Sequence, residues 1–207
     1  MHRFRILFLL ISSGLLVSCA VSTVKGLEAK KPQADTYTAT YFSDPATDYV
    51  YKAHISVYGK DFGGIFIAKK INDTLYRTAF TTEFGNKLFD FEITDDSFKV
   101  NYILEELDRK IIVNTLKRDF MLLLKKKHTI TEAYEDGTST IYKSEDGKRF
   151  NYLFLDKATG RLSKIVNATK SKEKIVINFS EENNILAKNI VIDHKNIKLK
   201  ILLNYIQ

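Results

Sequence analysis

The sequence predicts a mainly β protein built on a single strongly curved antiparallel sheet of about 11–13 strands, forming an open half-barrel with a helical lid inserted mid-chain. Most of the chain from residue 36 onward alternates aromatic and β-branched residues with polar ones, a period of two that is typical of strands. One stretch in the middle instead repeats apolar residues every three or four positions, which is typical of a helix. Together the two patterns indicate a long antiparallel meander with one helical excursion.

The N-terminus carries the features of a lipoprotein export signal. Arg3 and Arg5 precede an apolar stretch at 6–17, which is too short to cross a hydrocarbon core of ~30 Å as a helix. Residues 16–19, Leu-Val-Ser-Cys, match a lipobox, in which a small residue precedes the cysteine that takes a diacylglycerol. We therefore predict that 1–18 is a lipoprotein signal peptide and that Cys19 is lipidated, with acyl chains such as palmitate.

An ordinary secretory peptide with cleavage elsewhere is the alternative. Cys19 is the only cysteine in the sequence, so an exported form that kept it unmodified would hold a thiol with no disulfide partner. Lipidation explains this cysteine.

Residues 19–35 are expected to form a lipidated flexible tether, and 36–207 a single domain. After Cys19 the segment is small, polar and aperiodic. No acidic cluster follows Cys19, so we see no surface-export tag and expect the domain on the periplasmic side.

The basic excess does not indicate a nucleic-acid partner. Lys and Arg number 32 against 25 Asp and Glu, and the surplus is scattered in short groups such as 125–127 and 170–174. Basic residues on a lipoprotein more plausibly face anionic lipid headgroups or solvent.

The first group of strands is expected before the helix, at 36–42, 49–58, 64–71, 75–82, 87–94 and 97–102. The segments between them hold turn-forming pairs, including Asn72-Asp73, Gly85-Asn86 and Asp95-Asp96. Helical spacing then relates Ile103, Leu104, Leu107, Ile111, Ile112, Leu116, Phe120, Leu123 and Leu124. Alternation returns at 128–135, 138–144, 148–155, 161–169, 172–180, 185–193 and 196–206.

One face of the predicted sheet is strongly apolar. Its members are expected to come from several strands: Phe89, Phe91 and Ile93; Phe150, Tyr152 and Phe154; Ile175, Ile177 and Phe179; Ile197, Leu199, Ile201 and Leu203. A curved sheet of this length encloses a large volume, which is filled either by the chain's own side chains or by a ligand.

No catalytic or metal-binding pattern stands out. The four histidines are far apart in sequence, and neither a Gly-x-Ser-x-Gly elbow, a phosphate loop nor a dinucleotide fingerprint is present. Paired acidic residues such as Glu105-Glu106 sit at turns or helix starts, where structural roles explain them. We expect a protein that is not an enzyme and uses no cofactor or metal.

Two segments resemble the LolB family of the LolA/LolB superfamily. They are LYRTAFTTEFGNKLFDFEIT at 75–94 and NIKLKILLNYIQ at 196–207, and the order of tether, meander, helix and meander behind a lipobox also matches. The family's typical tryptophans are absent, and Tyr205 stands where the C-terminal one is expected.

The resemblance implies an outer-membrane lipoprotein that accepts acyl chains of lipoproteins or lipids from a periplasmic LolA-like carrier. It further implies a monomer at the inner leaflet of the outer membrane. The family's exposed membrane-entering residue would be Phe84, before Gly85, with Phe62 a weaker candidate. A phenylalanine folded back onto the core is the alternative for Phe84.

The acyl-chain cavity implied by the resemblance would be lined by residues of the strands and the helix: Phe89, Phe91, Ile93, Leu107, Ile111, Leu116, Phe120, Phe150, Phe154, Ile175, Ile177, Leu199 and Ile201. The alternative function is a structural or scaffolding envelope lipoprotein with a filled β core.

Overall fold

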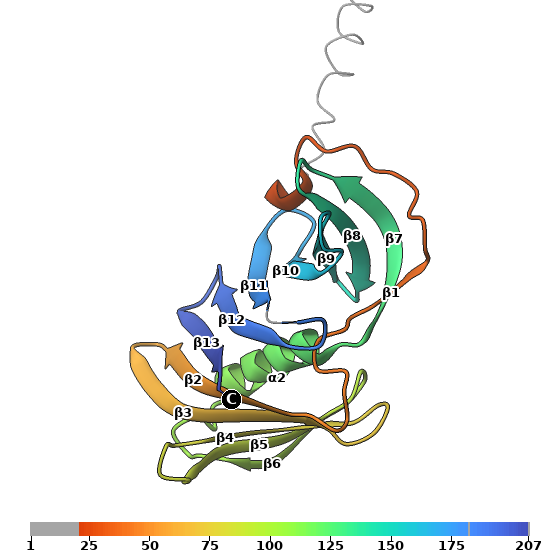
Figure 1. Cartoon of the computed structure of the whole chain (residues 1–207). Coiled ribbons are helices and arrows are strands. Elements are labelled where there is room, and N and C mark those ends of the chain that lie inside the picture. The colour runs from red at the N-terminus through yellow and green to blue at the C-terminus, as the bar shows by residue number, and fades with distance from the viewer. Residues whose placement is uncertain (1–20, 182, 207) are drawn as a thin grey trace, which may run out of the picture.

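The computed structural model describes residues 21–181 and 183–206. It contains one antiparallel sheet of 13 strands, in the order β1-β7-β8-β9-β10-β11-β12-β13-β2-β3-β4-β5-β6. The two edge strands are β1 and β6, so the sheet does not close into a barrel. One α-helix, α2, lies against the curved sheet (Figure 1). The predicted fold class is therefore confirmed.

The strands before the helix are β1 Thr36–Thr38, β2 Asp48–Val57, β3 Lys60–Lys70, β4 Tyr76–Thr81, β5 Lys87–Ile93 and β6 Phe98–Ile103. After α2 Lys110–Leu124 come β7 Lys127–Glu135, β8 Ser139–Asp146, β9 Arg149–Asp156, β10 Leu162–Ala168, β11 Glu173–Glu181, β12 Ala187–His194 and β13 Leu199–Tyr205. Each expected strand is present. The helix begins later than the periodicity predicted, because Ile103 pairs with Phe89 as the last residue of β6.

The C-terminal strand lies in the middle of the sheet. The last strand, β13, pairs with β2, and Ile201 lies opposite Ile55. Cross-strand pairing then carries one apolar row across eight strands: Tyr142, Leu153, Ile165, Ile177, Ile192, Ile201, Ile55 and Phe62. This row belongs to the main core, on the side of the sheet that α2 covers, which we call the helix face.

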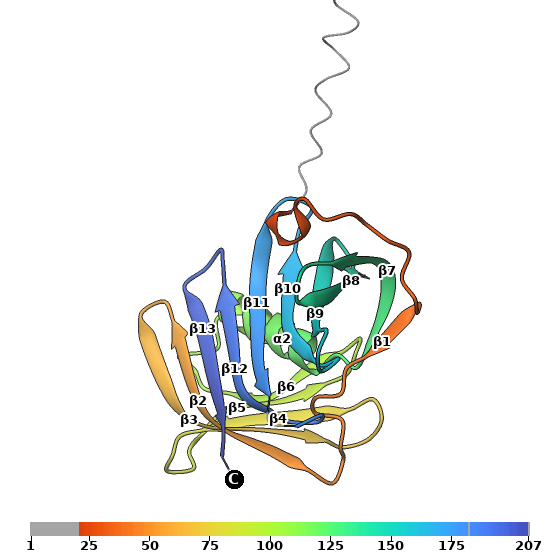
Figure 2. The same ribbon diagram turned by 45° about the horizontal axis from the view of Figure 1, so that its top comes forward.

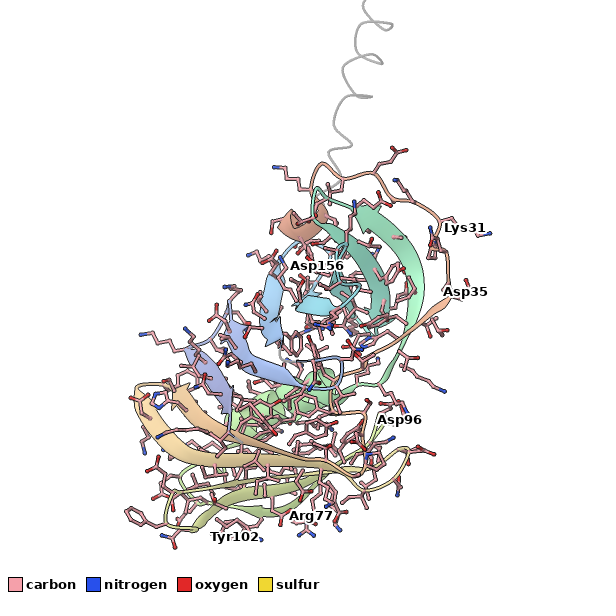
Figure 3. All side chains as sticks on the ribbon, viewed as in Figure 1. Lys31, Asp35, Arg77, Asp96, Tyr102 and Asp156 are labelled. Carbon is pink, nitrogen blue, oxygen red and sulfur yellow. The ribbon has the colours of Figure 1, made fainter. Side chains whose placement is uncertain are left out.

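Helix α2 packs most tightly against β3 and β5. The ring of Phe120 stacks on Phe66 with centroids 5.1 Å apart and lies 5.5 Å from Phe89, which in turn stacks on Phe91 at 4.4 Å. Side chains fill the space between α2 and β2–β5 (Figure 3). Each fully buried Leu or Phe contributes about 1.5–3 kcal/mol, so this aromatic cluster holds the helix on the sheet.

The opposite face of β7–β11 has a second apolar cluster. It contains Ile141, Tyr152, Phe154 and Val166, and it is completed by Val21 and Val24 of the short 3-10 helix η1 Ser22–Val24.

The described part of the expected tether, 21–35, lies on the domain, and we call it the strap. Besides the buried valines of η1, its Lys30 exchanges two backbone hydrogen bonds with Ala133 of β7, at 2.7 and 3.0 Å. Figure 2 shows the strap passing from η1 around the strands β7 and β8 into β1.

The predicted signal peptide 1–18 and the predicted lipidation site Cys19 lie outside the described residues. Within 21–181 and 183–206, no helix combines the length and the apolar character needed to cross a membrane.

The close approach of β3 and β4 requires a glycine. A Cβ added at Gly64 would lie 1.8 Å from the backbone oxygen of Thr81, whereas one added at Gly63 would meet no atom within 4 Å. Only the first position therefore excludes a side chain.

We expect Gly64→Ala to lower the free energy of unfolding by about 1–3 kcal/mol, because the backbone of β4 must shift to admit the methyl group. Gly63→Ala is the matched control. Urea denaturation followed by circular dichroism checks both variants, and equal losses of stability would contradict this role of Gly64.

Candidate functional site

A groove follows the side of α2 that faces away from the aromatic cluster. It consists of three adjoining cavities of about 380, 470 and 490 Å³. The first and second cavities share Ile111, and the second and third share Asn114 and Arg118. We call the three together the helix groove. Each has a volume typical of small-molecule sites, about 300–1,000 Å³.

The first cavity is the apolar end of the helix groove. Val57, Tyr58, Phe62, Ile111 and Ile112 supply most of its walls. Tyr58 and Gly59 have φ angles of 49° and 82° and form a two-residue hairpin turn between β2 and β3. The turn leaves the Tyr58 ring half exposed beside Ile111, which is 54% exposed although it is apolar.

The second and third cavities become polar toward the C-terminal end of α2. Apolar contacts in the second come from Ile111, Ile175 and Ile197. Its remaining lining is Lys110, Asn114, Thr115, Arg118, Arg149, His194 and Asn196. The third cavity is lined by Asp95, Asn114, Lys117, Arg118, Met121, Leu122, Lys125, Asp146 and Asn151.

A buried, hydrogen-bonded Asp–His pair fixes the position of α2 beside the groove. Asp119 on α2 is fully buried, and both of its carboxylate oxygens lie 2.9 Å from Nε2 of His194, at the end of β12. Burial raises the pKa of Asp119, and the hydrogen bond to His194 opposes this shift. The pair links the helix to the half of the sheet on the far side of the groove.

A chain of polar side chains crosses β9 and β10 on the helix face. Nη1 of Arg149 donates to Oδ1 of Asn167 at 2.8 Å, and Nδ2 of Asn167 donates to Oδ1 of Asn151 at 2.6 Å. Asn151 and Asn167 are directly opposite each other in the sheet. Polar side chains thus replace the apolar row at this level of the helix face.

Only part of the expected cavity lining borders a cavity. Ile111 and Ile175 line the helix groove, and Leu199 lines a separate cavity of about 230 Å³. Eight further residues of the expected lining belong to the main core and are packed against neighbouring side chains: Phe89, Phe91, Ile93, Leu107, Leu116, Phe120, Ile177 and Ile201.

Phe150 and Phe154 do not share a face with Ile175 and Ile177, contrary to the prediction. They belong to the second apolar cluster, beneath the strap. In β9 the set with Phe150, Tyr152 and Phe154 is the more apolar of the two, so the alternation alone points to the wrong face. The pairing of Leu153 with Ile165, and of Ile165 with Ile177, assigns Leu153 to the helix face instead.

Phe84 lies at the tip of the β4–β5 turn and is 94% exposed. The alternative in which it folds back onto the core is therefore wrong. Gly85 has a φ of 86°, and its amide donates to the carbonyl oxygen of Thr82, which fixes the tight turn that presents the ring.

The sequence interpretation missed the polar members of the groove. These residues come from three elements and form no sequence motif: Arg118, Arg149, Asn151 and Asn167. The only signal in the sequence was a polar residue at a strand position that otherwise faces inward. In the described chain, no group of three or more His, Cys, Asp and Glu side chains could hold a metal ion.

Comparison with solved structures identifies the fold. A LolA superfamily protein from Nitrosomonas europaea superposes with a TM-score of 0.52 and 10% sequence identity, over 82% of this chain and 88% of that one. The chain has the fold of a LolA superfamily protein.

A second solved structure, a domain assigned to outer membrane lipoprotein sorting in Vibrio parahaemolyticus, aligns with a TM-score of 0.48 and 7% identity. The alignment covers 80% of this chain and 86% of that domain. No protein-family model matches the sequence, and no curated protein matches it. At the level of the fold, the LolA/LolB resemblance is thus supported by the first structure.

We expect Asp119→Ala to lower the free energy of unfolding by about 3–5 kcal/mol, because it leaves the buried His194 ring without its partner. Asp119→Asn keeps an acceptor oxygen and should cost less. Chemical denaturation of both variants measures the difference, and a loss below about 1 kcal/mol for Asp119→Ala would contradict the role of the pair.

His128, buried on β7, should make the stability depend on pH. Its burial, followed by the charge of Lys125, lowers the pKa of the ring from 6.5 to about 4. Between these values the unfolded chain binds a proton that the folded chain does not, so stability is fully present above pH 6.5 and falls as the pH drops toward 4.

The loss over this range should be about 3 kcal/mol. Denaturation at a series of pH values, compared with His128→Phe, checks the assignment. A variant with the same pH dependence as the wild type would assign the effect to other groups.

Proposed function

We propose that this chain is a non-enzymatic lipoprotein that binds acyl chains on the periplasmic face of the outer membrane. In this proposal Cys19 carries the lipid anchor and the protein acts as a monomer. It accepts the acyl chains of lipoproteins or lipids from a LolA-like periplasmic carrier and passes them to the inner leaflet, a LolB-like role.

The helix groove is the observation that carries the proposal. Its apolar end is walled by Tyr58, Phe62, Ile111 and Ile112, and the second cavity adjoins it at Ile111. An apolar cavity of this volume suits an alkyl chain better than it suits a compact polar metabolite.

Transfer needs only a gradient of affinity. Burying a CH₂ group gains about 0.8 kcal/mol, and a groove that is open on one side buries only part of each one. The free energy of an alkyl chain is therefore less favourable in such a site than in a bilayer, which buries the chain on all sides. Release into the membrane is therefore downhill and requires no chemical step.

A scaffolding lipoprotein with a filled core is the second candidate. The solid packing between α2 and β3–β5 favours it, because eight of the expected cavity residues contact other side chains rather than open space. Native mass spectrometry of the purified protein separates the two functions: bound acyl species support lipid handling, and a stable protein partner without lipid supports scaffolding.

Ile111→Asn should weaken binding of an uncharged alkyl probe, dodecyl maltoside, about tenfold, because it places an amide where the first two cavities meet. Ile111 is half exposed, so folding should be unchanged. Ile71→Asn makes the same substitution at an exposed isoleucine of the β3–β4 turn and is the control. Calorimetric titration of both variants measures the loss, and equal affinities would contradict a site at Ile111.

Phe84→Glu should reduce binding to phospholipid vesicles, because it replaces an exposed ring that could enter the interface with a charge. Phe84→Leu retains an apolar side chain and should keep most of the binding. Co-sedimentation with vesicles measures both variants. Undiminished binding of Phe84→Glu, with an unchanged circular dichroism spectrum, would remove the turn from the membrane contact.

A further inference from the structure

The two cavities at the C-terminal part of the helix groove carry an excess of positive charge. Five basic side chains line them, against two carboxylates: Lys110, Lys117, Arg118, Lys125 and Arg149, against Asp95 and Asp146. Lysines at a solvent-facing helix surface are ordinary. Arg118 and Arg149 both line the second cavity, and they are the unusual feature.

Arg118 and Arg149 belong to two different elements that border this cavity. Arg118 projects from α2, and Arg149 is the first residue of β9. No ion pair within 4 Å joins either arginine to a carboxylate in residues 21–181 and 183–206. Burial, followed by the charge of Arg118, lowers the pKa of Arg149, and Asp146 only partly offsets this. An anion between the two guanidinium groups would relieve their repulsion.

A buried donor without an acceptor lies beside the arginines. Asn151 is fully buried and lines the third cavity, and its Oδ1 accepts from Asn167. Its Nδ2 has no hydrogen-bond partner among the described residues. The amide of Asn167 differs, because its Nδ2 donates to Oδ2 of Asp146 at 3.4 Å as well as to Asn151. A buried amide donor without an acceptor is costly, which indicates that a ligand oxygen belongs there.

We propose that the helix groove binds an amphiphile with a phosphate headgroup, whose oxygens accept from Arg118, Arg149 and Asn151 while its alkyl chain runs past Ile111 into the apolar cavity. This inference rests on the proposed acyl-chain binding and adds the class of headgroup. Phosphate fits because guanidinium groups bind its oxygens in pairs and the amide can satisfy another.

Calorimetric titration of the purified protein with three probes tests the proposal. They are dodecyl phosphate, dodecyl maltoside and inorganic phosphate, each below any micelle-forming concentration. The wild type should bind dodecyl phosphate about tenfold or more tightly than dodecyl maltoside, because a charge-assisted hydrogen bond is worth at least that factor. Inorganic phosphate should bind far more weakly than either alkyl probe.

Arg118→Gln should lower the affinity for dodecyl phosphate about tenfold more than it lowers that for dodecyl maltoside, because only the phosphate probe is charged. Arg118 is exposed, so this variant should fold. Lys172→Gln removes one positive charge from an exposed turn away from the groove and should change neither affinity. Asn151→Asp, of the same shape, should also abolish the preference for phosphate.

The outcomes separate this inference from the proposed function. Equal affinity of the wild type for the two alkyl probes would overturn the headgroup assignment and leave acyl-chain binding intact. If inorganic phosphate bound as tightly as dodecyl phosphate, the arginines would be assigned to a free anion. The proposal that the ligand is an amphiphile would then be overturned. Failure of both alkyl probes to bind would overturn the proposed function together with this inference.

Discussion

The seating of α2 on the helix face is the constraint on which the rest of the structure depends. Phe120 anchors the helix among Phe66 and Phe89, and Asp119 bonds to His194 across the opening of the sheet. One helix side is therefore buried in the aromatic cluster while its neighbouring side, with Ile111 and Arg118, faces β9 and β12 across open space. A rotation of the helix about its axis would exchange these two environments, and the two sets of contacts together oppose it.

This division explains how a single sheet supports both a solid core and a groove. The β2–β5 half contributes buried phenylalanines, which fill the space between this half of the sheet and α2. The β8–β12 half presents smaller and polar side chains around the paired residues Asn151 and Asn167. A cavity therefore remains there between the helix and the sheet. The outcome is an apolar cavity and two basic cavities that adjoin along α2, an arrangement suited to a ligand with unlike ends.

Strand positions were predictable because alternation and turn chemistry agree along nearly the whole chain. Ile103 shows where periodicity misleads: it continues the helical spacing, yet its backbone pairs with Phe89. Phe154 shows a second limit, since the more apolar set of β9 lies on the face away from the helix and only the register reveals this. The groove itself was beyond sequence reasoning, because Arg118 and Arg149 become neighbours only through the seating of the helix.

The strap lies between the proposed lipid anchor at Cys19 and the first strand of the sheet. Cys19 precedes the buried Val21 by at most about 7 Å of extended chain. In the proposed anchored state, a docked strap keeps η1 at the membrane, while the β4–β5 turn lies at the far end of the molecule (Figures 1 and 2). Undocking residues 21–35 would free about 50 Å of chain, enough for the domain to turn over. Docking or undocking of the strap would then set the orientation of the domain relative to its anchor.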